Sequence, residues 1–205
     1  MDRTDFLSWL LALAAVGAII AGAFVTLAAL RPPAETIEFE ATDVTGVQWG
    51  RDFHLTGHDG ERRGLADFRG KVVALYFGYT RCPDVCPLTL ATLGQAVQLL
   101  GEDGKRVQVA FVTVDPRHDK PRALQRYVRS FGEDFLALYG DAAATARTAA
   151  EFRVEGGAHH SIPVFLFDPS GRLRLVAHPD ATAESIAHDI RLLLAQAEAG
   201  QRGGA

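Results

Sequence analysis

The sequence predicts an α/β protein in which a central mixed sheet carries helices on its faces, preceded by a single N-terminal transmembrane helix. Three observations predict this class. The run at residues 6–30 carries no charge. Farther along, short apolar runs alternate with segments in which apolar residues recur three and four positions apart. These two kinds of segment follow one another in an order that is typical of a layered sheet with short crossovers.

The predicted membrane anchor is the run FLSWLLALAAVGAIIAGAFVTLAAL at residues 6–30. It exceeds the roughly 20 apolar residues with which a helix crosses a bilayer. A cleaved signal peptide, whose apolar core is roughly 7 to 15 residues long, is the alternative, because small residues near the end of the run suit a processing site. We assign residues 1–30 to the anchor and 31–37 to a tether that two consecutive prolines stiffen.

Residues 38–198 have the length of one domain with its own hydrophobic core, and residues 199–205 are expected to form a flexible tail. The chain is 48% apolar and carries a formal net charge of −4. Because there is no surplus of basic residues to attract phosphates, the composition argues against nucleic acid as a partner.

In the first half of the domain, the sequence predicts a hairpin, two strands and two helices. FHL and the turn at residues 57–60 predict the hairpin, and the nearly continuous apolar run KVVALYFGY predicts a buried central strand. Apolar residues at helical spacing from Cys86 onward predict a helix that ends near Gly101. RVQVAFVTVD predicts a second strand, and DKPRALQRYVRSF predicts a second helix that Asp119 caps.

The second half predicts two more strands, a closing hairpin and two helices. FLALYG predicts a third strand, and Asp141 caps a helix that extends to about Phe152. IPVFLFD predicts a fourth strand, which a turn at residues 168–171 joins to RLRLV, and a final helix covers residues 183–197. Short crossovers predict parallel strands and the closing hairpin adds an antiparallel one, which together is the thioredoxin-like arrangement.

Both cysteines of the chain, Cys82 and Cys86, lie in YFGYTRCPDVCPLTL, where the central strand passes into a helix. Ligands collect at the carboxyl end of such a strand. A separation of four on a helical turn places the two α-carbons about 6 Å apart, which a disulfide can span. A helix N-terminus also favours the thiolate, which is both the nucleophile and the metal ligand. The pair therefore predicts reversible oxidation or binding of a soft metal, and two thiols that only fill space are the alternative.

A third ligand is available next to the fourth strand, where His159 and His160 stand in EGGAHHSIPVFLFD. In a thioredoxin-like sheet this loop lies beside the turn that carries the cysteines. Two thiolates and one imidazole suit Cu(I) and also accept Cu(II). Zinc is the competing metal, but a structural zinc site usually has four protein ligands, which would require His159 to join.

Three motifs resemble the Sco/SenC family of copper-binding proteins: GYTRCPDVCPLTL, VTVDPRHDKP and HHSIPVFLFDPSG. They contain C-x-x-x-C, D-P-x-x-D and a histidine directly before a serine at a strand start. The resemblance covers most of residues 50–195 together with the single N-terminal anchor. It implies one copper ion held by Cys82, Cys86 and His160.

The same resemblance implies a role and a location. Proteins of this family help to mature the dinuclear copper centre of cytochrome c oxidase subunit II, as copper donor, as thiol reductant, or both. Subunit II is therefore the implied partner, with other periplasmic copper chaperones or thiol-disulfide proteins as further partners. Because the anchor begins at Phe6, no mitochondrial presequence fits before it, and we expect a single-pass protein of the bacterial inner membrane with its domain in the periplasm.

Two positions depart from the family pattern. Pro163 stands where thioredoxins carry a cis-proline, so we predict a cis Ile162–Pro163 bond facing the cysteines, which favours redox chemistry. His159 is an additional imidazole, which we expect to be exposed. The main alternative function is therefore a membrane-anchored thiol-disulfide oxidoreductase that cycles Cys82 and Cys86 without metal, and a third is a metal or redox sensor.

The D-P-x-x-D segment supplies three further polar side chains near the predicted site. We expect Asp115, at the end of a strand, to tune or gate the site. Asp119 is assigned to the helix cap, and His118 between them is expected to face solvent rather than to bind a metal.

Overall fold

The structure is a computed structural model that describes residues 38–154 and 162–203. The predicted anchor and tether before residue 38, and the loop that contains His159 and His160, lie outside the described residues. In the part that is described, no helix is both long enough and apolar enough to cross a membrane. The fold below belongs to the compact unit Phe39–Ala205.

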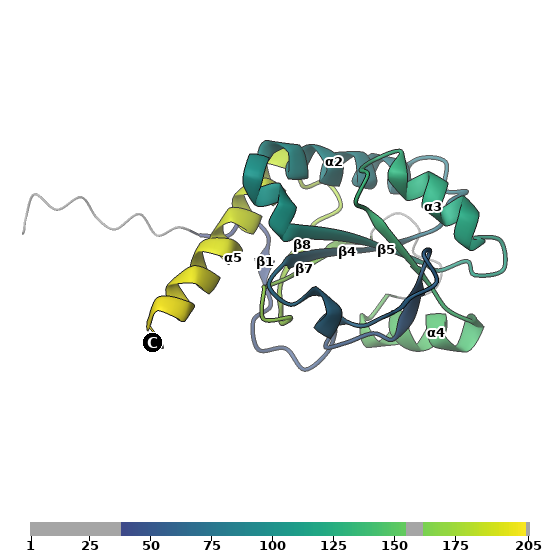
Figure 1. The fold of residues 1–205 in the computed structure, drawn as a ribbon, viewed down its shortest axis with the longest axis horizontal. Coiled ribbons are helices and arrows are strands. Elements are labelled where there is room, and N and C mark those ends of the chain that lie inside the picture. The colour runs from purple at the N-terminus through teal and green to yellow at the C-terminus, as the bar shows by residue number, and fades with distance from the viewer. Residues whose placement is uncertain (1–37, 155–161, 204–205) are drawn as a thin grey trace, which may run out of the picture. The chain divides into compact units, whose positions relative to one another are not determined.

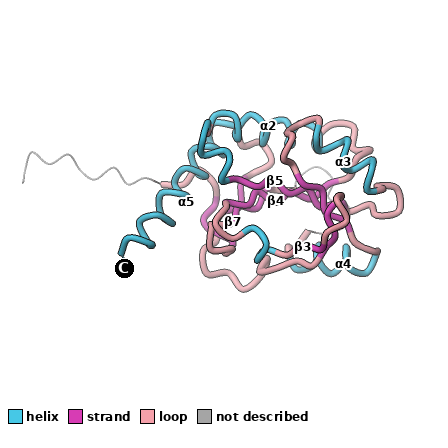
Figure 2. The backbone as a smooth tube through the Cα atoms, viewed as in Figure 1, coloured by secondary structure: helices cyan, strands magenta, loops and turns pink. Residues whose placement is uncertain are grey.

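One sheet of eight strands forms the centre of this unit, in the order β1-β8-β7-β4-β5-β6-β2-β3. Figure 2 shows the strands in the middle of the domain, with helices and loops around them. The strands are β1 (Thr42–Asp43), β2 (Leu55–Gly57), β3 (Arg62–Arg63), β4 (Val72–Gly78), β5 (Val107–Thr113), β6 (Leu136–Tyr139), β7 (Val164–Phe167) and β8 (Leu173–Ala177).

Helices cover both faces of the sheet. In Figure 1, α2 and α3 lie on one side of the strands and α4 lies on the other, and α5 packs against α2. The helices are η1 (Leu65–Phe68), α2 (Val85–Leu99), η2 (Gly101–Arg106), α3 (Pro121–Arg129), α4 (Ala142–Glu151) and α5 (Ala183–Gly203). The predicted central sheet with flanking helices is therefore confirmed.

β4 occupies the middle of the sheet, as its apolar run predicts, and all seven of its residues are buried. Its side chains enter a cluster of aromatic rings. The ring of Phe77 lies 5.9 Å from that of Phe165 and 5.2 Å from that of Phe152, measured between centroids. Aromatic pairs at such distances stabilise beyond the area they bury, by about 0.5–1.5 kcal/mol each. This packing gives the end of β4, where the cysteine loop begins, a rigid base.

The direction of the fourth predicted strand differs from the prediction. β4, β5 and β6 are parallel neighbours, but β7 pairs with β4 in the antiparallel sense, with Leu75 opposite Phe165 and Val73 opposite Phe167. The chain after α4 re-enters the sheet at the edge where β4 ends, so β7 must run in the opposite direction. As a result, the beginning of β7 and the end of β4 share one edge of the sheet.

Two terminal features were not expected from local patterns. The two-residue strand β1 pairs with β8, and the buried carboxylate of Asp189 in α5 accepts the N–H groups of Glu40 and Ala41, both at 2.8 Å. In addition, α5 extends to Gly203 instead of ending near residue 197. An ion pair one turn apart, Arg202 to Glu198, lies on this extension.

The Ile162–Pro163 bond is trans, because the described residues contain no cis peptide bond. The prediction of a cis bond is therefore wrong. A trans bond is favoured by about 0.5–1 kcal/mol before proline, and Pro163 leads directly into β7, where the backbone is already extended. The argument for redox chemistry that depended on a cis-proline falls with it.

Candidate dithiol and metal site

The two cysteines lie at the strand-to-helix junction where the sequence predicts them. Cys82 is in the loop that follows β4, and Cys86 is the second residue of α2. Both are free thiols, with 8% and 2% of their surface exposed. The backbone N–H of Cys86 donates to Cys82 Sγ at 3.4 Å, and the N–H of Cys82 donates to the carbonyl of Tyr79 at 3.2 Å. A tight turn thus brings the first sulfur onto the N-terminus of the helix that carries the second.

The two thiols have opposite electrostatic character. Burial alone raises the pKa of Cys82, but the backbone N–H groups of Cys86 and Asp84, with the Cys86 thiol and the Tyr79 hydroxyl, outweigh burial and lower this pKa below its ordinary value. Burial raises the pKa of Cys86 to about 11, and the neighbouring sulfur of Cys82 adds to the rise. Cys82 is therefore the first of the pair to form a thiolate and the more reactive nucleophile.

Residues of β4 form the base of the site beneath Cys86. The buried hydroxyl of Tyr76 donates to Cys86 Sγ at 3.8 Å. Gly78 is the last residue of β4, and a Cβ at this position would lie 2.8 Å from the same sulfur. A glycine is needed here because the sulfur occupies the space of a side chain. Sequence reasoning missed this role, although a glycine at a strand end is a known signal of close approach.

Asp119 does not cap a helix, contrary to the prediction. The N-cap position of α3 is Lys120, and no side chain caps this helix end. The Asp119 carboxylate is buried and points instead to the cysteine loop, where it accepts from the N–H and the hydroxyl of Thr80, and to β5, where it accepts from Thr113. By contrast, the prediction that Asp141 caps α4 is confirmed, since its carboxylate accepts the N–H of Ala144 at 2.7 Å.

Asp115 lies at the end of β5, next to the cysteine loop. It accepts from Arg81 at 3.0 Å and contacts Nδ1 of His118 at 2.9 Å. These partners outweigh the effect of burial and lower the pKa of Asp115. The side chain of His118 is 54% exposed, as predicted. Asp115 thus joins β5 to the residue adjacent to Cys82, and its predicted tuning or gating of the site stays a prediction.

The proposed third ligand is not placed by the structure, because His159 and His160 lie outside the described residues. Within residues 38–154 and 162–203, no three side chains of the metal-binding types form a cluster. The register of β7 does supply one relevant fact: the strand that follows the histidines begins at the edge where β4 ends. The structure therefore brings together the two cysteines, and His160 as the third ligand stays a prediction.

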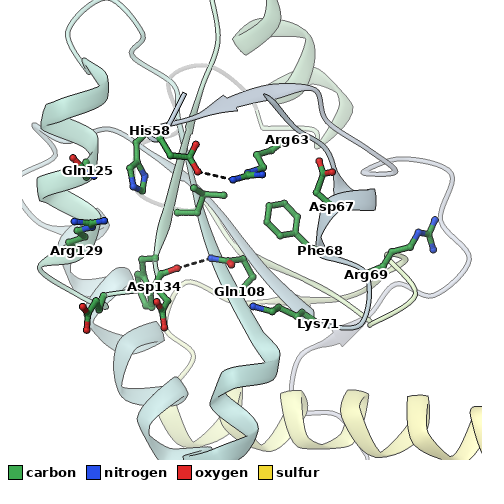
Figure 3. Close-up of a pocket in the computed structure, with 14 residues that line it drawn as sticks. His58, Arg63, Asp67, Phe68, Arg69, Lys71, Gln108, Gln125, Arg129 and Asp134 are labelled. Atoms are coloured by element: carbon green, nitrogen blue, oxygen red, sulfur yellow. Dashed lines mark hydrogen bonds and ion pairs between the residues drawn. The ribbon is translucent and has the colours of Figure 1, made fainter. Parts of the chain in front are cut away.

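A pocket of about 420 Å³ lies elsewhere in the domain and contains neither cysteine. Figure 3 shows acidic and basic side chains around it, among them Arg129, Asp134 and Lys71. Lys71 directly precedes β4, so the pocket lies toward the edge of the sheet where β4 begins. His58, also in its lining, accepts the N–H of Ala137 at 3.1 Å through Nδ1. Because it contains neither cysteine and lies toward the beginning of β4, the pocket does not belong to the dithiol site.

Comparison with known proteins identifies one family. A protein-family model described as SCO1/SenC matches residues 41–195. The human protein "Protein SCO2 homolog, mitochondrial" is 39% identical over an alignment of 153 positions, gaps included, and the alignment covers 68% of this chain and 58% of the human protein. The chain therefore spans less than two thirds of the length of that relative.

Solved structures with the same fold include members with and without copper. The copper-bound structure of ScoI from Bradyrhizobium japonicum is 29% identical, with a TM-score of 0.61. The match covers 70% of this chain and 98% of the ScoI chain. The apo Sco1 structure from Thermus thermophilus is 36% identical, with a TM-score of 0.64, covering 78% and 97%. The mixed sheet with flanking helices is thus the thioredoxin-like fold of these proteins, as the sequence predicts.

Proposed function

The chain belongs to the SCO1/SenC family, and from this premise we propose that it is a membrane-anchored copper chaperone that assists maturation of the dinuclear copper centre of cytochrome c oxidase subunit II. The observation that carries the proposal is the pair of free, adjacent thiols at the carboxyl end of β4. A copper-bound structure with the same fold supports the choice of metal. The anchor at residues 6–30 would hold the domain on the periplasmic side of the bacterial inner membrane.

The proposed ligands of the single copper ion are Cys82, Cys86 and His160. Two thiolates and an imidazole form a soft set of low coordination number that suits Cu(I). One buried group near the sulfurs can donate a hydrogen bond to a thiolate. The hydroxyl of Tyr127 is buried without a hydrogen-bond partner in the described part of the chain; burial raises its pKa, and the charges of Cys86, Cys82 and Asp119 add to the rise. An unpartnered hydroxyl near two sulfurs is available as a donor when these become thiolates.

Loading would proceed from the more reactive thiol. Cys82 supplies a thiolate at lower pH, whereas Cys86 keeps its proton until the metal displaces it. Copper binding therefore releases protons, and its affinity should fall as the solution becomes more acidic. Transfer to a partner would begin at Cys82, the more exposed sulfur, by exchange of one protein thiolate for one partner thiolate at a time.

The test is the copper stoichiometry and Cu(I) affinity of three variants, Cys82→Ser, Cys86→Ser and His160→Ala, measured by competition with a chromophoric chelator. We expect each variant to lose high-affinity binding. His159→Ala is the matched control for the imidazole, because it removes a neighbouring histidine outside the proposed ligand set, and it should bind like the wild type. Undiminished binding in all three ligand variants would remove the proposal.

The opposite pKa shifts of the two thiols favour one alternative, a thiol-disulfide oxidoreductase. In this chemistry, the Cys82 thiolate attacks a partner disulfide and Cys86 then resolves the mixed disulfide. The pair would lose two electrons and two protons to form a Cys82–Cys86 disulfide, and the partner would leave as a dithiol. Purification without reductant separates the two functions: bound copper with two reduced thiols supports the chaperone, and a metal-free disulfide that exchanges rapidly supports the oxidoreductase.

A further inference from the structure

Asp119 is a buried acid that the proposed copper chemistry does not use. Asp119 as a whole is 2% exposed. Oδ2 accepts the Thr80 N–H at 3.0 Å and the Thr113 hydroxyl at 2.6 Å, and Oδ1 accepts the Thr80 hydroxyl at 2.5 Å. None of the ion pairs in the described part of the chain involves this carboxylate. A buried carboxylate without a cation is costly unless hydrogen bonds stabilise it, so these three bonds account for its presence.

The hydrogen bonds connect two parts of the chain that are distant in sequence. Thr80 lies two residues before Cys82, in the loop that follows β4, whereas Thr113 is the last residue of β5. Asp119 is itself fixed, because its N–H donates to the carbonyl of Asp115 at 3.0 Å. The carboxylate therefore fastens the cysteine loop to the end of the neighbouring strand.

Other bonds also fix the loop, among them the ion pair of Arg81 with Asp115 at 3.0 Å. At its start, the carbonyl of Gly78 accepts the N–H of Val114 at 2.8 Å, and the next turn is closed by the bond from Cys82 N–H to the Tyr79 carbonyl. Thr80 lies inside this turn, so both of its bonds to Asp119 act directly on the segment that orients Cys82. If that segment moves, Cys82 Sγ leaves the N–H groups at the start of α2 that now donate to it.

We propose that Asp119 is a positioning residue of the dithiol site, which holds Thr80 and thereby sets the position of Cys82 Sγ relative to Cys86. Stabilisation of α3 does not explain the residue, because its carboxylate makes no cap bond to that helix. For copper binding the inference rests on the proposed function. For the thiol chemistry of the pair it does not, which allows the two to be tested separately.

Two substitutions separate the hydrogen bonds of Asp119 from its charge. Asp119→Ala removes all three bonds. Asp119→Asn keeps the size of the side chain and one acceptor oxygen, which can still hold the N–H of Thr80 and the hydroxyl of Thr113. The matched control is Asp141→Ala, which also removes a carboxylate that accepts a backbone N–H, but at the start of α4. All variants are made in the full 205-residue chain and compared by urea unfolding.

The first readout is independent of copper: the equilibrium between the Cys82–Cys86 dithiol and its disulfide in glutathione buffers. Asp119→Ala should shift this equilibrium toward the disulfide, because the loosened loop loses N–H groups that stabilise reduced Cys82. The second readout is Cu(I) affinity, which should weaken by about 10- to 100-fold, as is typical when a residue that orients a ligand is removed. Asp119→Asn should give smaller changes of the same sign, and Asp141→Ala should change neither quantity.

The proposal is overturned if Asp119→Ala leaves both readouts at wild-type values, or if Asp141→Ala shifts them equally. Should Asp119→Ala fail to fold, Asp119→Asn and Thr113→Val decide the question, since each is nearly isosteric with the residue it replaces. Wild-type readouts in both of these would overturn it. If the wild-type chain itself binds no copper, the proposed function fails, whereas the glutathione equilibrium still tests Asp119.

Discussion

The close approach of Gly78 to Cys86 gives the sharpest prediction. A Cβ at position 78 would lie 2.8 Å from Cys86 Sγ and 2.8 Å from the Phe111 ring, about 0.6 Å short of the 3.4 Å at which ordinary contact begins. Phe111 is fully buried and cannot retreat easily. Overpacking of this kind costs about 1–3 kcal/mol, so Gly78→Ala should lower the free energy of unfolding by that amount. The sulfur should move away from β4.

Urea unfolding of the reduced protein measures the loss of stability. A double-mutant cycle shows how much of this loss comes from the contact with the Cys86 sulfur. In a Cys86→Ala background one of the two close contacts is absent, so Gly78→Ala should be less destabilising there, with a coupling energy of about 0.5–3 kcal/mol. Gly94→Ala is the control for crowding away from the sulfurs, since its Cβ would meet the Phe131 carbonyl oxygen at 2.5 Å. Gly200→Ala, with nothing within 4 Å, should be neutral or slightly stabilising.

The equilibrium between the Cys82–Cys86 dithiol and its disulfide gives a second measure of the effect of Gly78→Ala. Gly78→Ala should alter the glutathione equilibrium of the cysteine pair, because it displaces one sulfur. Gly94→Ala should destabilise the fold and leave that equilibrium unchanged. The reasoning is refuted if Gly78→Ala unfolds at the wild-type urea concentration, or if its cost is the same with and without the Cys86 sulfur.

The remaining predictions concern pH. Near neutral pH, iodoacetamide should modify Cys82 before Cys86, as peptide mass mapping will reveal, because Cys82 has the lower pKa and the greater exposure; modification in the reverse order would contradict the assignment. Because folding raises the pKa of Cys86 from 9.0 to about 11, its contribution to stability is complete below pH 9 and is lost as the pH rises toward 11. Cys86→Ala should flatten that decline in urea unfolding, and an unchanged decline would disprove it. The hydrogen bonds in the β7–β8 turn outweigh burial and lower the pKa of Asp168 below 3.8, so its contribution is present above pH 3.8 and is lost as the pH falls through the folded value. Asp168→Asn should be less stable than the wild type at neutral pH, and the difference should shrink in acid; a constant difference would argue against the assignment.

Sequence patterns predicted the elements whose signals are local. The apolar run of β4 and the aspartate before α4 each indicate, from local sequence alone, the element that forms there. The structure confirms both. The direction of β7 has no such local cause. All four of its residues are buried, so their apolar pattern does not distinguish the antiparallel pairing with β4 from a parallel one. Such a choice depends on the path of a connection rather than on the strand.

The residues around the cysteines also show that local sequence does not determine tertiary contacts. The sequence identified Cys82 and Cys86, because two thiols four residues apart at a strand end carry a chemical signal. It assigned Asp119 to a helix cap because aspartate close to a helix start is normally one. The structure instead turns this carboxylate to Thr80, a partner 39 residues earlier, and no local rule contains that pairing. Gly78 was missed for a similar reason, since the sulfur that needs its space comes from the next helix.

These tertiary contacts decide what the C-x-x-x-C motif can do. On an isolated helix, two cysteines four residues apart would be equivalent apart from their distance to the N-terminus. Here β4 buries Cys86 over Gly78, whereas the turn held by Asp119 keeps Cys82 Sγ on the N–H groups of α2. One thiol therefore holds its proton while the other loses it more readily, and the two sulfurs lie adjacent. Disulfide exchange starts from the thiol that ionises more readily, so the pairing of β4 with β5, which brings Asp119 beside the cysteine loop, is part of the site.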